Sequence, residues 1–247
     1  MFSILGTGEG GRVIDTPTRL VVEAPIPQPP YNGVWRFYDE ADRPLRQQVA
    51  ELLAPFSDRG VALMWLVHPT TPPEVREHLA GEGLVCADEL PGMVGDLRYL
   101  DPMPPVPEPV EMIEATAAES EAWVHLVSWR YGLDTSTSPY LRQVYANAMG
   151  GHTRLWIAYI AGEPVSKVAM HVDNGVAGIH GVATTEKGRN RGPATALTLT
   201  ALHAARDEGV ETSVLHSTLM AHALYERLGY QDVATFEVWA EPETLHL

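Results

Sequence analysis

Apolar and polar residues alternate along the first hundred residues in a pattern that predicts strands alternating with helices. Residues 44–56 place four apolar side chains at helical spacing, with a polar opposite face. Residues 60–67 form a continuous apolar run before a proline-rich turn, which is typical of a buried strand. Residues 71–84 begin with prolines and end on glycines, as a short helix does. The pattern predicts further strands at residues 19–25, 32–38 and 93–100.

The second half of the chain has a richer pattern. Residues 115–132 and 140–151 have the periodicity and glycine stops of two helices. Residues 153–185 contain three apolar runs separated by the turn signals AGEP and DNG, so we expect an antiparallel meander. The pattern then predicts a helix, a strand, a second helix and a closing strand at residues 193–209, 210–218, 220–229 and 230–240.

A proline-rich segment separates the two halves. Residues 100–111 contain five prolines, which disfavour both helix and sheet pairing, so the segment is predicted to be a stiff, extended connection. The expected domains are residues 1–106 and residues 107–247.

Composition limits the classes of function. The chain has 247 residues, with 45% hydrophobic and 20% charged residues, as in a soluble globular protein. No apolar run reaches the roughly 18 residues of a membrane span, and the start of the chain lacks the features of a secretory signal. The one cysteine, Cys86, rules out an internal disulfide and a zinc site built on paired cysteines. We therefore expect a cytoplasmic protein.

The charge balance is strongly acidic. There are 32 Asp and Glu against 17 Lys and Arg, a formal net charge of -15. Such a balance repels nucleic acids and anionic membranes, so neither is expected as a partner. Any cluster of positive charge in this chain needs a local explanation.

Two glycine-rich loops compete as phosphate-binding sites. The first, GTGEGG, has Gly6, Gly8 and Gly11 at the spacing of a dinucleotide-binding turn. The residues that follow lack helical periodicity, and Pro17 interrupts them. Without a helix there is no helix N-terminus to face a pyrophosphate. This loop is interpreted as a flexible turn, and a nucleotide-binding protein that uses it remains an alternative.

The second loop, within residues 186–197, lies between a predicted strand and a long predicted helix. Gly192 permits close approach of a ligand to the backbone, and Pro193 suits the first position of a helix. The N–H groups of residues 189–195, apart from Pro193, are expected to point toward one spot, where the helix dipole adds positive potential. Three cations add formal charge: Lys187, Arg189 and Arg191. The loop favours a polyanion, although an ordinary helix start with solvated basic residues is the alternative.

These residues resemble the GNAT superfamily of acetyl-CoA-dependent N-acetyltransferases. The run RNRGPA, residues 189–194, resembles the signature R/Q-x-x-G-x-G/A, and ALYERLGY, residues 223–230, resembles the second recurrent motif of the family. The likeness covers about residues 111–240. It implies an α+β fold with a mixed, mostly antiparallel sheet flanked by helices. That sheet would separate between the strands at residues 178–185 and 210–217, and acetyl-CoA would lie in the split.

The N-terminal half resembles a faint second copy of this arrangement. Residues 62–93 repeat the order strand, polar turn, helix and strand of residues 212–239, but they lack an R-x-x-G-x-G/A counterpart and the helix lacks a tyrosine. We interpret residues 1–106 as a degenerate, non-catalytic GNAT-like domain that packs against the active half. Two unrelated domains of a common α+β type are the alternative.

The resemblance implies positions for the cofactor and for a general acid. Tyr225 stands where the family commonly places the acid that protonates the CoA thiolate; a tyrosine packed in the core is the alternative. Thr218 stands where relatives often have Asn, and Ser217 or Thr218 would replace it in part. The residues expected to contact CoA are Val182, Ala183, Thr184, Lys187, Arg189, Asn190, Arg191, Gly192, Pro193, Ala194, Thr195, Ser217 and Thr218.

The general base is less clear from the resemblance. Many relatives carry Glu on the strand before the loop, where this chain has Gly178. His180 lies two residues further on the same face of the strand and would take the proton of the amine, directly or through water. A buried histidine satisfied by a neighbour is the alternative. His171, His216 and Asp134 are further candidates for the base.

The predicted activity is therefore acetyl transfer from acetyl-CoA to a primary amine of a small molecule or peptide, by direct attack in a ternary complex. The acceptor is expected at residues 131–143, where Asp134 would hold a cationic amine. The ten histidines lack metal-ligand spacing, so no metal is predicted. The alternative function is a CoA-binding sensor or partner-binding module without catalysis. The oligomeric state stays open, with a homodimer among the expected arrangements.

Overall fold

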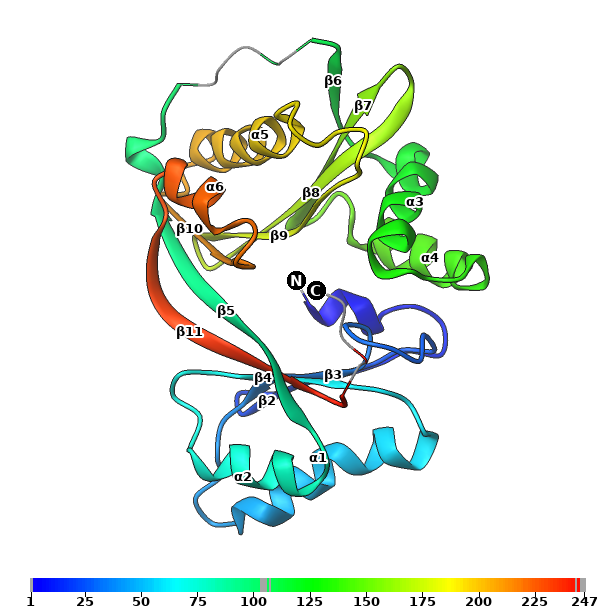
Figure 1. The fold of residues 1–247 in the computed structure, drawn as a ribbon, viewed down its shortest axis with the longest axis vertical. Helices are drawn as coiled ribbons and strands as arrows, with labels where there is room; N and C mark the ends of the chain where they lie inside the picture. The colour runs from blue at the N-terminus through cyan, green and yellow to red at the C-terminus, as the bar shows by residue number, and fades with distance from the viewer. Residues whose placement is uncertain (1, 103–105, 107, 243, 245–247) are drawn as a thin grey trace. The chain divides into compact units, whose positions relative to one another are not determined.

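The computed structural model describes residues 2–102, 106, 108–242 and 244, and these residues divide into two compact units (Figure 1). The middle unit is Gly92–Val233, and the terminal unit combines Phe2–Pro91 with the chain from Ala234 onward. The predicted domains, residues 1–106 and 107–247, are bounded at the proline-rich segment instead, and they stay a prediction. The difference arises because two long strands, β5 (Val85–Asp96) and β11 (Gln231–Ala240), each supply residues to both units.

The terminal unit is a small sheet with the strand order β1-β2-β3-β4-β11. All its neighbouring strands are antiparallel except β3 and β4, which run parallel and are joined through a helix. Apolar side chains of both helices pack on this sheet, around Phe56, Trp65 and Leu79. Besides β11, the elements of this unit are η1 (Phe2–Gly6), β1 (Arg12–Asp15), β2 (Arg19–Glu23), β3 (Gly33–Phe37), α1 (Leu45–Arg59), β4 (Met64–Val67) and α2 (Glu74–Gly81).

The strands of the middle unit follow the order β5-β10-β9-β8-β7-β6. Only β9 and β10 are parallel in this series; the other pairs are antiparallel. The strands are β6 (Val110–Glu114), β7 (Thr153–Ile160), β8 (Glu163–Asp173), β9 (Val176–Thr184) and β10 (Thr212–His216). The helices are α3 (Ser120–Tyr131), α4 (Ser138–Ala148), α5 (Pro193–Asp207) and α6 (His222–Arg227). Short 3₁₀ turns are η2 (Leu97–Tyr99), η3 (Ala117–Glu119) and η4 (Thr135–Thr137).

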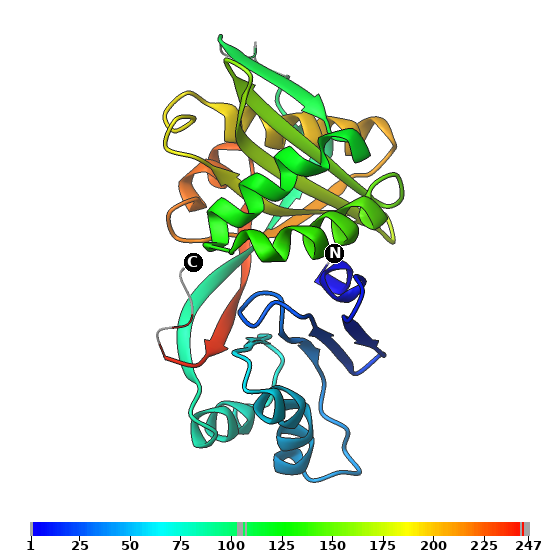
Figure 2. The same cartoon turned by 90° about the vertical axis from the view of Figure 1, so that its right-hand side faces the viewer.

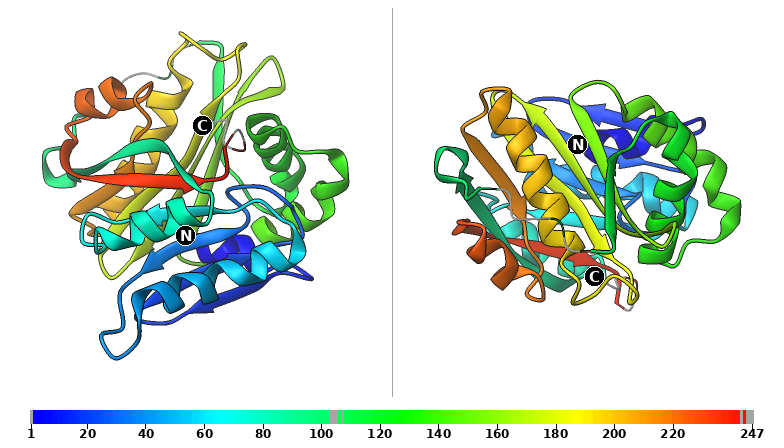
Figure 3. Two further views of the ribbon diagram at one scale, coloured as in Figure 1. Left: turned by 60° about the horizontal axis from the view of Figure 1, so that its bottom comes forward. Right: turned by 90° about the horizontal axis from the view of Figure 1, so that it is seen from above.

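Helices cover both faces of the sheet in the middle unit. Helices α3 and α4 lie on one face and α5 lies on the other (Figures 2 and 3). Alternate residues of β8 and β9, among them Val168, Met170 and Ile179, pack with Leu197 and Leu202 of α5 in one apolar core. The intervening residues of the two strands face α3 and α4 because side chains alternate along a strand.

The predicted α+β class with a mixed, mostly antiparallel sheet flanked by helices is confirmed. The antiparallel meander is β7, β8 and β9. Two details differ from the sequence pattern. The end of the proline-rich segment, predicted as an extended connection, joins the sheet as β6. Strand β5 begins at Val85 and ends at Asp96, whereas the predicted strand was at residues 93–100. It ends there because the Asp96 carboxylate accepts the N–H of Arg98 and starts η2. Of the helices in the described residues, none has the length and apolarity to cross a lipid bilayer.

Candidate functional site

Strands β9 and β10 separate part-way along their length. Their parallel pairing begins at Thr212 with Val176 and ends at Val214 with Gly178, whereas β9 continues to Thr184. Because β10 and β8 are the neighbours of β9 in the sheet, residues 179–184 keep β8 on one side and lose their ladder on the other. The unpaired backbone edge of β9 can therefore bind an extended ligand. These are the two strands between which the family resemblance predicted the split.

A β-bulge lies on this unpaired stretch. Gly181 and Val182 together stand opposite Val168 of β8, and Gly181 has φ +59°, which favours glycine. Beyond the bulge the side chain of Ser166 donates a hydrogen bond of 2.9 Å to the carbonyl of Ala183. The bulge turns the backbone at the position where the sequence places contacts with the pantetheine arm.

The turn from β9 into α5 leaves several amide groups available. The N–H groups of Asn190, Gly192, Ala194 and Thr195 have no acceptor among the residues that the structure describes. The prediction for residues 189–195 is corrected in part, because the N–H groups of Arg189 and Arg191 close the turn on carbonyls of residues 185, 186 and 188. The helix begins at Pro193, as expected, so its first turn still presents free donors.

The three cations of this loop differ in their contacts. Lys187 is paired with the Glu163 carboxylate of β8 at 2.5 Å, which removes it from the unpaired charge of the turn. The guanidinium groups of Arg189 and Arg191 are exposed and make no ion pair with any described residue. Gly188 is buried, and a Cβ there would lie 2.9 Å from Thr184 of β9 and 3.1 Å from Val165 of β8. The loop thus packs closely on β8 while both arginines extend into solvent.

Tyr225 lies in the core between α6 and the strands. Its side chain is 5% exposed and meets the Tyr230 ring edge-on, with ring centroids 5.9 Å apart. Burial raises the pKa of Tyr225 to about 12, so its hydroxyl keeps the proton at neutral pH. Within the described part of the chain that hydroxyl has no hydrogen-bond partner, whereas the Tyr230 hydroxyl lies 2.6 Å from Ser213 Oγ. Of the two phenols, Tyr225 is the one available as a donor.

His180 covers the backbone of Gly178. A Cβ built on Gly178 would lie 2.5 Å from the His180 Nε2, so the imidazole occupies the space of a side chain at position 178. Burial, with a smaller contribution from the neighbouring His216 and His171, lowers the pKa of His180 to about 3. The ring is therefore neutral at neutral pH. Its face of the sheet is the one that α3 and α4 cover.

The remaining predicted residues have local structural contacts. Asp134 accepts the N–H of Ser136 at 2.8 Å and caps η4, a bond that lowers its pKa. Ser217 is buried, and its hydroxyl donates to the Thr218 carbonyl at 2.8 Å. His171 contacts the Thr153 hydroxyl at 2.8 Å on β7. Each of these residues has a partner of its own within the protein, and its role in the site stays a prediction.

The model of the acetyltransferase (GNAT) family matches residues 120–230, which include the split, the basic turn and α6. This region is a GNAT domain. Among solved structures, the chain is similar to a GCN5-related N-acetyltransferase from Kribbella flavida, at 18% identity and a TM-score of 0.68 over 97% of this chain and 91% of that one. No curated protein sequence matches the chain.

Two further structures share the fold over almost the whole chain. A GCN5-related N-acetyltransferase from Sphaerobacter thermophilus is 16% identical, with a TM-score of 0.67 over 92% of this chain and 82% of that one. A tandem GNAT protein from the clavulanic acid biosynthesis pathway is 16% identical, with a TM-score of 0.64 over 93% and 81%. At these identities the likeness concerns the fold alone, and it extends beyond the GNAT domain into the terminal unit.

The GNAT domain contains one residue that the sequence reasoning missed. Lys167 lies on β8, is 2% exposed and donates a hydrogen bond of 2.6 Å to the Gly181 carbonyl at the bulge. A lysine inside the apolar run VSKVAMHV was the signal that could have identified it. Apolar neighbours on a strand predict that a lysine among them is buried, and a buried lysine needs a polar partner.

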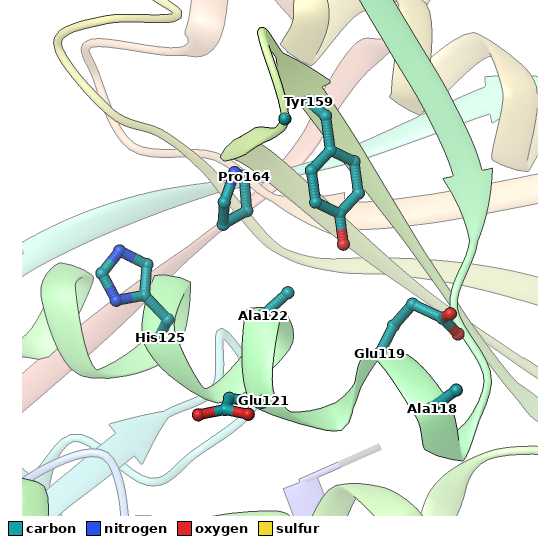
Figure 4. A pocket seen from close by; sticks show the side chains of 8 residues that line it. Ala118, Glu119, Glu121, Ala122, His125, Tyr159 and Pro164 are labelled. Atoms are coloured by element: carbon teal, nitrogen blue, oxygen red, sulfur yellow. The ribbon is translucent and has the colours of Figure 1, made fainter.

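A separate hollow of about 560 Å³ lies at the surface of the GNAT domain (Figure 4). The start of α3 and the turn between β7 and β8 form it, and the Tyr159 ring points across it toward α3. Glu119, at its edge, is occupied in the capping box of η3 with Thr116. None of the site residues predicted from the sequence lines this hollow, so it is distinct from the split between β9 and β10.

Proposed function

We propose that the protein transfers the acetyl group of acetyl-CoA to a primary amine of a small molecule or peptide, by direct attack in a ternary complex. The start of α5 is the single observation that carries this proposal. Among the described residues, four N–H groups without an acceptor and two arginines without an ion pair meet there, beside a strand edge that has no partner strand. This arrangement fits a ligand with a diphosphate and an extended amide-containing arm, which is the chemistry of CoA.

In this proposal the diphosphate accepts hydrogen bonds from the N–H groups of Asn190, Gly192, Ala194 and Thr195. Arg189 and Arg191 add charge-assisted contacts. The pantetheine arm lies along β9, where its amides pair with the backbone of Val182, Ala183 and Thr184, and Ser217 and Thr218 face it from the end of β10. Lys187 contributes only after it leaves Glu163.

The chemical step forms one bond and breaks one. The lone pair of the neutral amine attacks the acetyl carbon, and a C–N bond forms as the C–S bond of the thioester breaks. The thiolate takes a proton from the Tyr225 hydroxyl, whose high pKa keeps that proton in place until the sulfur becomes basic. Solvent then returns a proton to Tyr225.

We propose that the amine loses its proton to His180 through water. With a pKa of about 3, His180 is a neutral acceptor and a weak base. It receives the proton only as the C–N bond forms, when the amine nitrogen becomes strongly acidic. The loss of a glutamate at Gly178 and this weak base favour the alternative function, a CoA-binding sensor without turnover.

We further propose that residues 1–106 form a degenerate GNAT-like domain and residues 107–247 the catalytic domain of a cytoplasmic enzyme. The same order of strands and helices in both regions supports this proposal. The acceptor would bind near residues 131–143. Asp134 has one carboxylate oxygen in the cap of η4, which leaves the other for a cationic amine.

Calorimetry and a thiol-release assay test the proposal together. Acetyl-CoA and CoA should bind to the purified chain, whereas NAD should not. With a panel of polyamines, amino sugars, amino acids and peptides, at least one amine should release free CoA and yield an acetylated product by mass spectrometry. Tight CoA binding without thiol release from any amine would support the sensor instead. Absence of CoA binding would contradict both functions.

A further inference from the structure

Lys167 is a buried cation that has no carboxylate partner in the described structure. It extends from β8, directly opposite Ala183 of β9, and makes no ion pair with any acidic group in the described residues. Burial, together with the charge of Arg130, lowers its pKa to about 7. Placing a lysine in such a position costs free energy, because the charged form loses its water without gaining a counter-ion.

The contacts of Lys167 are nevertheless specific. Its Nζ donates to the Gly181 carbonyl at 2.6 Å and lies 5.0 Å from the centre of the Trp123 ring of α3. The aromatic face stabilises the ammonium in a place that water hardly reaches. A Cβ at Gly181 would come within 3.2 Å of the Nζ, so the bulge and the lysine fit one another closely. The ammonium is directed at one peptide group.

That peptide group joins Gly181 to Val182. In a trans peptide the carbonyl and the N–H point in opposite directions, so the Val182 N–H points away from Lys167. A cation bound to a carbonyl polarises the whole peptide and makes its N–H a stronger donor. Val182 is the first of the β9 residues that the proposed function places along the pantetheine arm.

We propose that Lys167 is a positioning residue for acetyl transfer, whose ammonium fixes the bulge at Gly181 and strengthens the Val182 N–H as a donor to the acetyl oxygen. This inference rests on the proposed function. Negative charge develops on the acetyl oxygen when the amine attacks, and a pre-oriented donor stabilises the transition state more than the ground state. Lys167 itself touches neither substrate.

The decisive variant is Lys167→Met, which keeps the length of the side chain and removes the charge and the donor. We expect kcat to fall about 10- to 100-fold, less than or equal to the loss of an oxyanion donor. The dissociation constant of acetyl-CoA should change less than about 3-fold, because the diphosphate contacts are elsewhere. The melting temperature should rise, since a buried charge is replaced by an apolar group. A merely structural lysine predicts a lower melting temperature and an unchanged kcat.

Lys167→Gln and Ser166→Ala are the matched variants. Glutamine keeps a neutral donor toward Gly181, so its kcat should lie between those of the wild type and Lys167→Met. Ser166→Ala removes a neutral donor from the neighbouring Ala183 carbonyl and should lower kcat less than Lys167→Met does. If Lys167→Met does not fold, Lys167→Gln carries the test. Equal kcat for the wild type and the glutamine variant, with equal carbonyl frequencies, would overturn the proposal.

The pH dependence gives a second readout. The loss of kcat in Lys167→Met relative to the wild type should be largest at pH 6. It should shrink above pH 8, where the wild-type Lys167 loses its positive charge. Arg130 of α3, His171 of β8 and His180 of β9 are the other titratable or charged groups on this face, and both histidines are already neutral at pH 8. A deficit that does not vary with pH would contradict the inference.

Infrared spectroscopy separates this inference from the proposed function. The carbonyl stretch of bound [1-¹³C]acetyl-CoA needs no acceptor and no turnover. We expect a lower frequency on the wild type than on Lys167→Met at pH 6. If no amine is acetylated but the frequencies differ, the proposed function fails and the role of Lys167 in polarising the thioester stands. If an amine is acetylated and both frequency and kcat match between the two proteins, Lys167 has no such role.

Discussion

The turns before α5 and α1 stand at corresponding places in the two units, and they differ in charge. Each turn follows a strand and begins the helix that joins a parallel pair, β9 to β10 in one unit and β3 to β4 in the other. Within the part of the chain that the structure describes, the turn before α5 has two unpaired arginines and four free N–H groups. The turn before α1 carries Asp39 and Glu40, and a phosphate there would meet carboxylates.

The turn before α1 is also filled by its own side chains. Gln48 is buried, accepts the N–H of Glu40 and donates to the carbonyl of Arg43 at 2.9 Å. Glu40 in turn binds Arg19 at 2.6 Å and Arg43 at 3.3 Å. The positive charges of Arg19 and Arg43 near this helix start are therefore already neutralised by Glu40. The space that the proposed function gives to a diphosphate before α5 is occupied by glutamine and glutamate before α1.

The two parallel pairs repeat this contrast. Strands β3 and β4 pair at Gly33 with Met64 and at Val34 with Trp65, and then the ladder stops, as it does between β9 and β10. Beyond that point the His68 ring donates to the Trp35 carbonyl at 3.1 Å. The carbonyl that an extended ligand would bind is taken by the protein. The shared order of elements preserves the fold, whereas ligand binding depends on which groups are left unpaired.

The largest expected effect concerns α6, because the corresponding helix α2 contains no tyrosine. Tyr225→Phe should lower kcat about 100-fold through loss of a general acid, with little change in CoA affinity. Steady-state thiol release and calorimetry measure the two quantities. Tyr230→Phe is the control: it loses a hydroxyl bonded to Ser213, so stability should fall while kcat stays within about 3-fold. Unchanged turnover of Tyr225→Phe would remove it from the chemistry.

The next effect compares the arginines of the two turns. The double variant Arg189→Ala and Arg191→Ala should weaken CoA binding about 30-fold, since each exposed charge-assisted contact contributes about 1 kcal/mol. The melting temperature should stay the same because neither side chain has a described partner. Arg43→Ala, in the turn before α1, should leave CoA affinity unchanged. Equal loss from both variants would mean that general charge, not the α5 turn, holds the ligand.

The sequence was sufficient to locate the α5 turn because its signals are local. Glycine and proline at positions 192 and 193 specify a helix start, and the alternation of apolar residues predicts the meander before it. The family resemblance then supplied the separation of two adjacent strands. Each inference required only neighbouring residues, and the structure confirms the helix start at Pro193 and the fold.

Features that depend on distant residues could not be predicted. The division between the units follows from β5 and β11, whose long-range pairing no local pattern encodes. The ion pair of Lys187 with Glu163 joins residues 24 positions apart, and the bond of Lys167 to Gly181 depends on the register of two strands. Which N–H groups are free in the turn before α5 likewise depends on the hydrogen bonds within that turn, and no sequence pattern specifies these.

A smaller effect tests whether Gln48 closes the turn before α1. Gln48→Met should lower the free energy of unfolding by about 1–2 kcal/mol, because several hydrogen bonds are lost while the apolar volume is kept. Urea denaturation measures the change. CoA affinity should not change, since carboxylates still line the turn. A gain of CoA binding in this variant would show that only the glutamine, not the charge, separates the two turns.

The smallest effect is the pH dependence of the same turn. Hydrogen bonds from Arg19, Thr18 and Arg43 lower the pKa of Glu40 to about 2, from a usual 4.5. A carboxyl whose pKa is lowered by folding stabilises the folded state above pH 4.5, and this contribution is lost as pH falls toward 2. Glu40→Gln should therefore have a lower melting temperature than the wild type at pH 6, with the gap narrowing between pH 4.5 and 2. Because Glu40 lies near solvent, 1 M salt should reduce the gap as well. A gap that persists at pH 2 would mean that Glu40 acts through packing. Of the two carboxylates in the turn before α1, only Asp39 would then support the contrast in charge with the turn before α5.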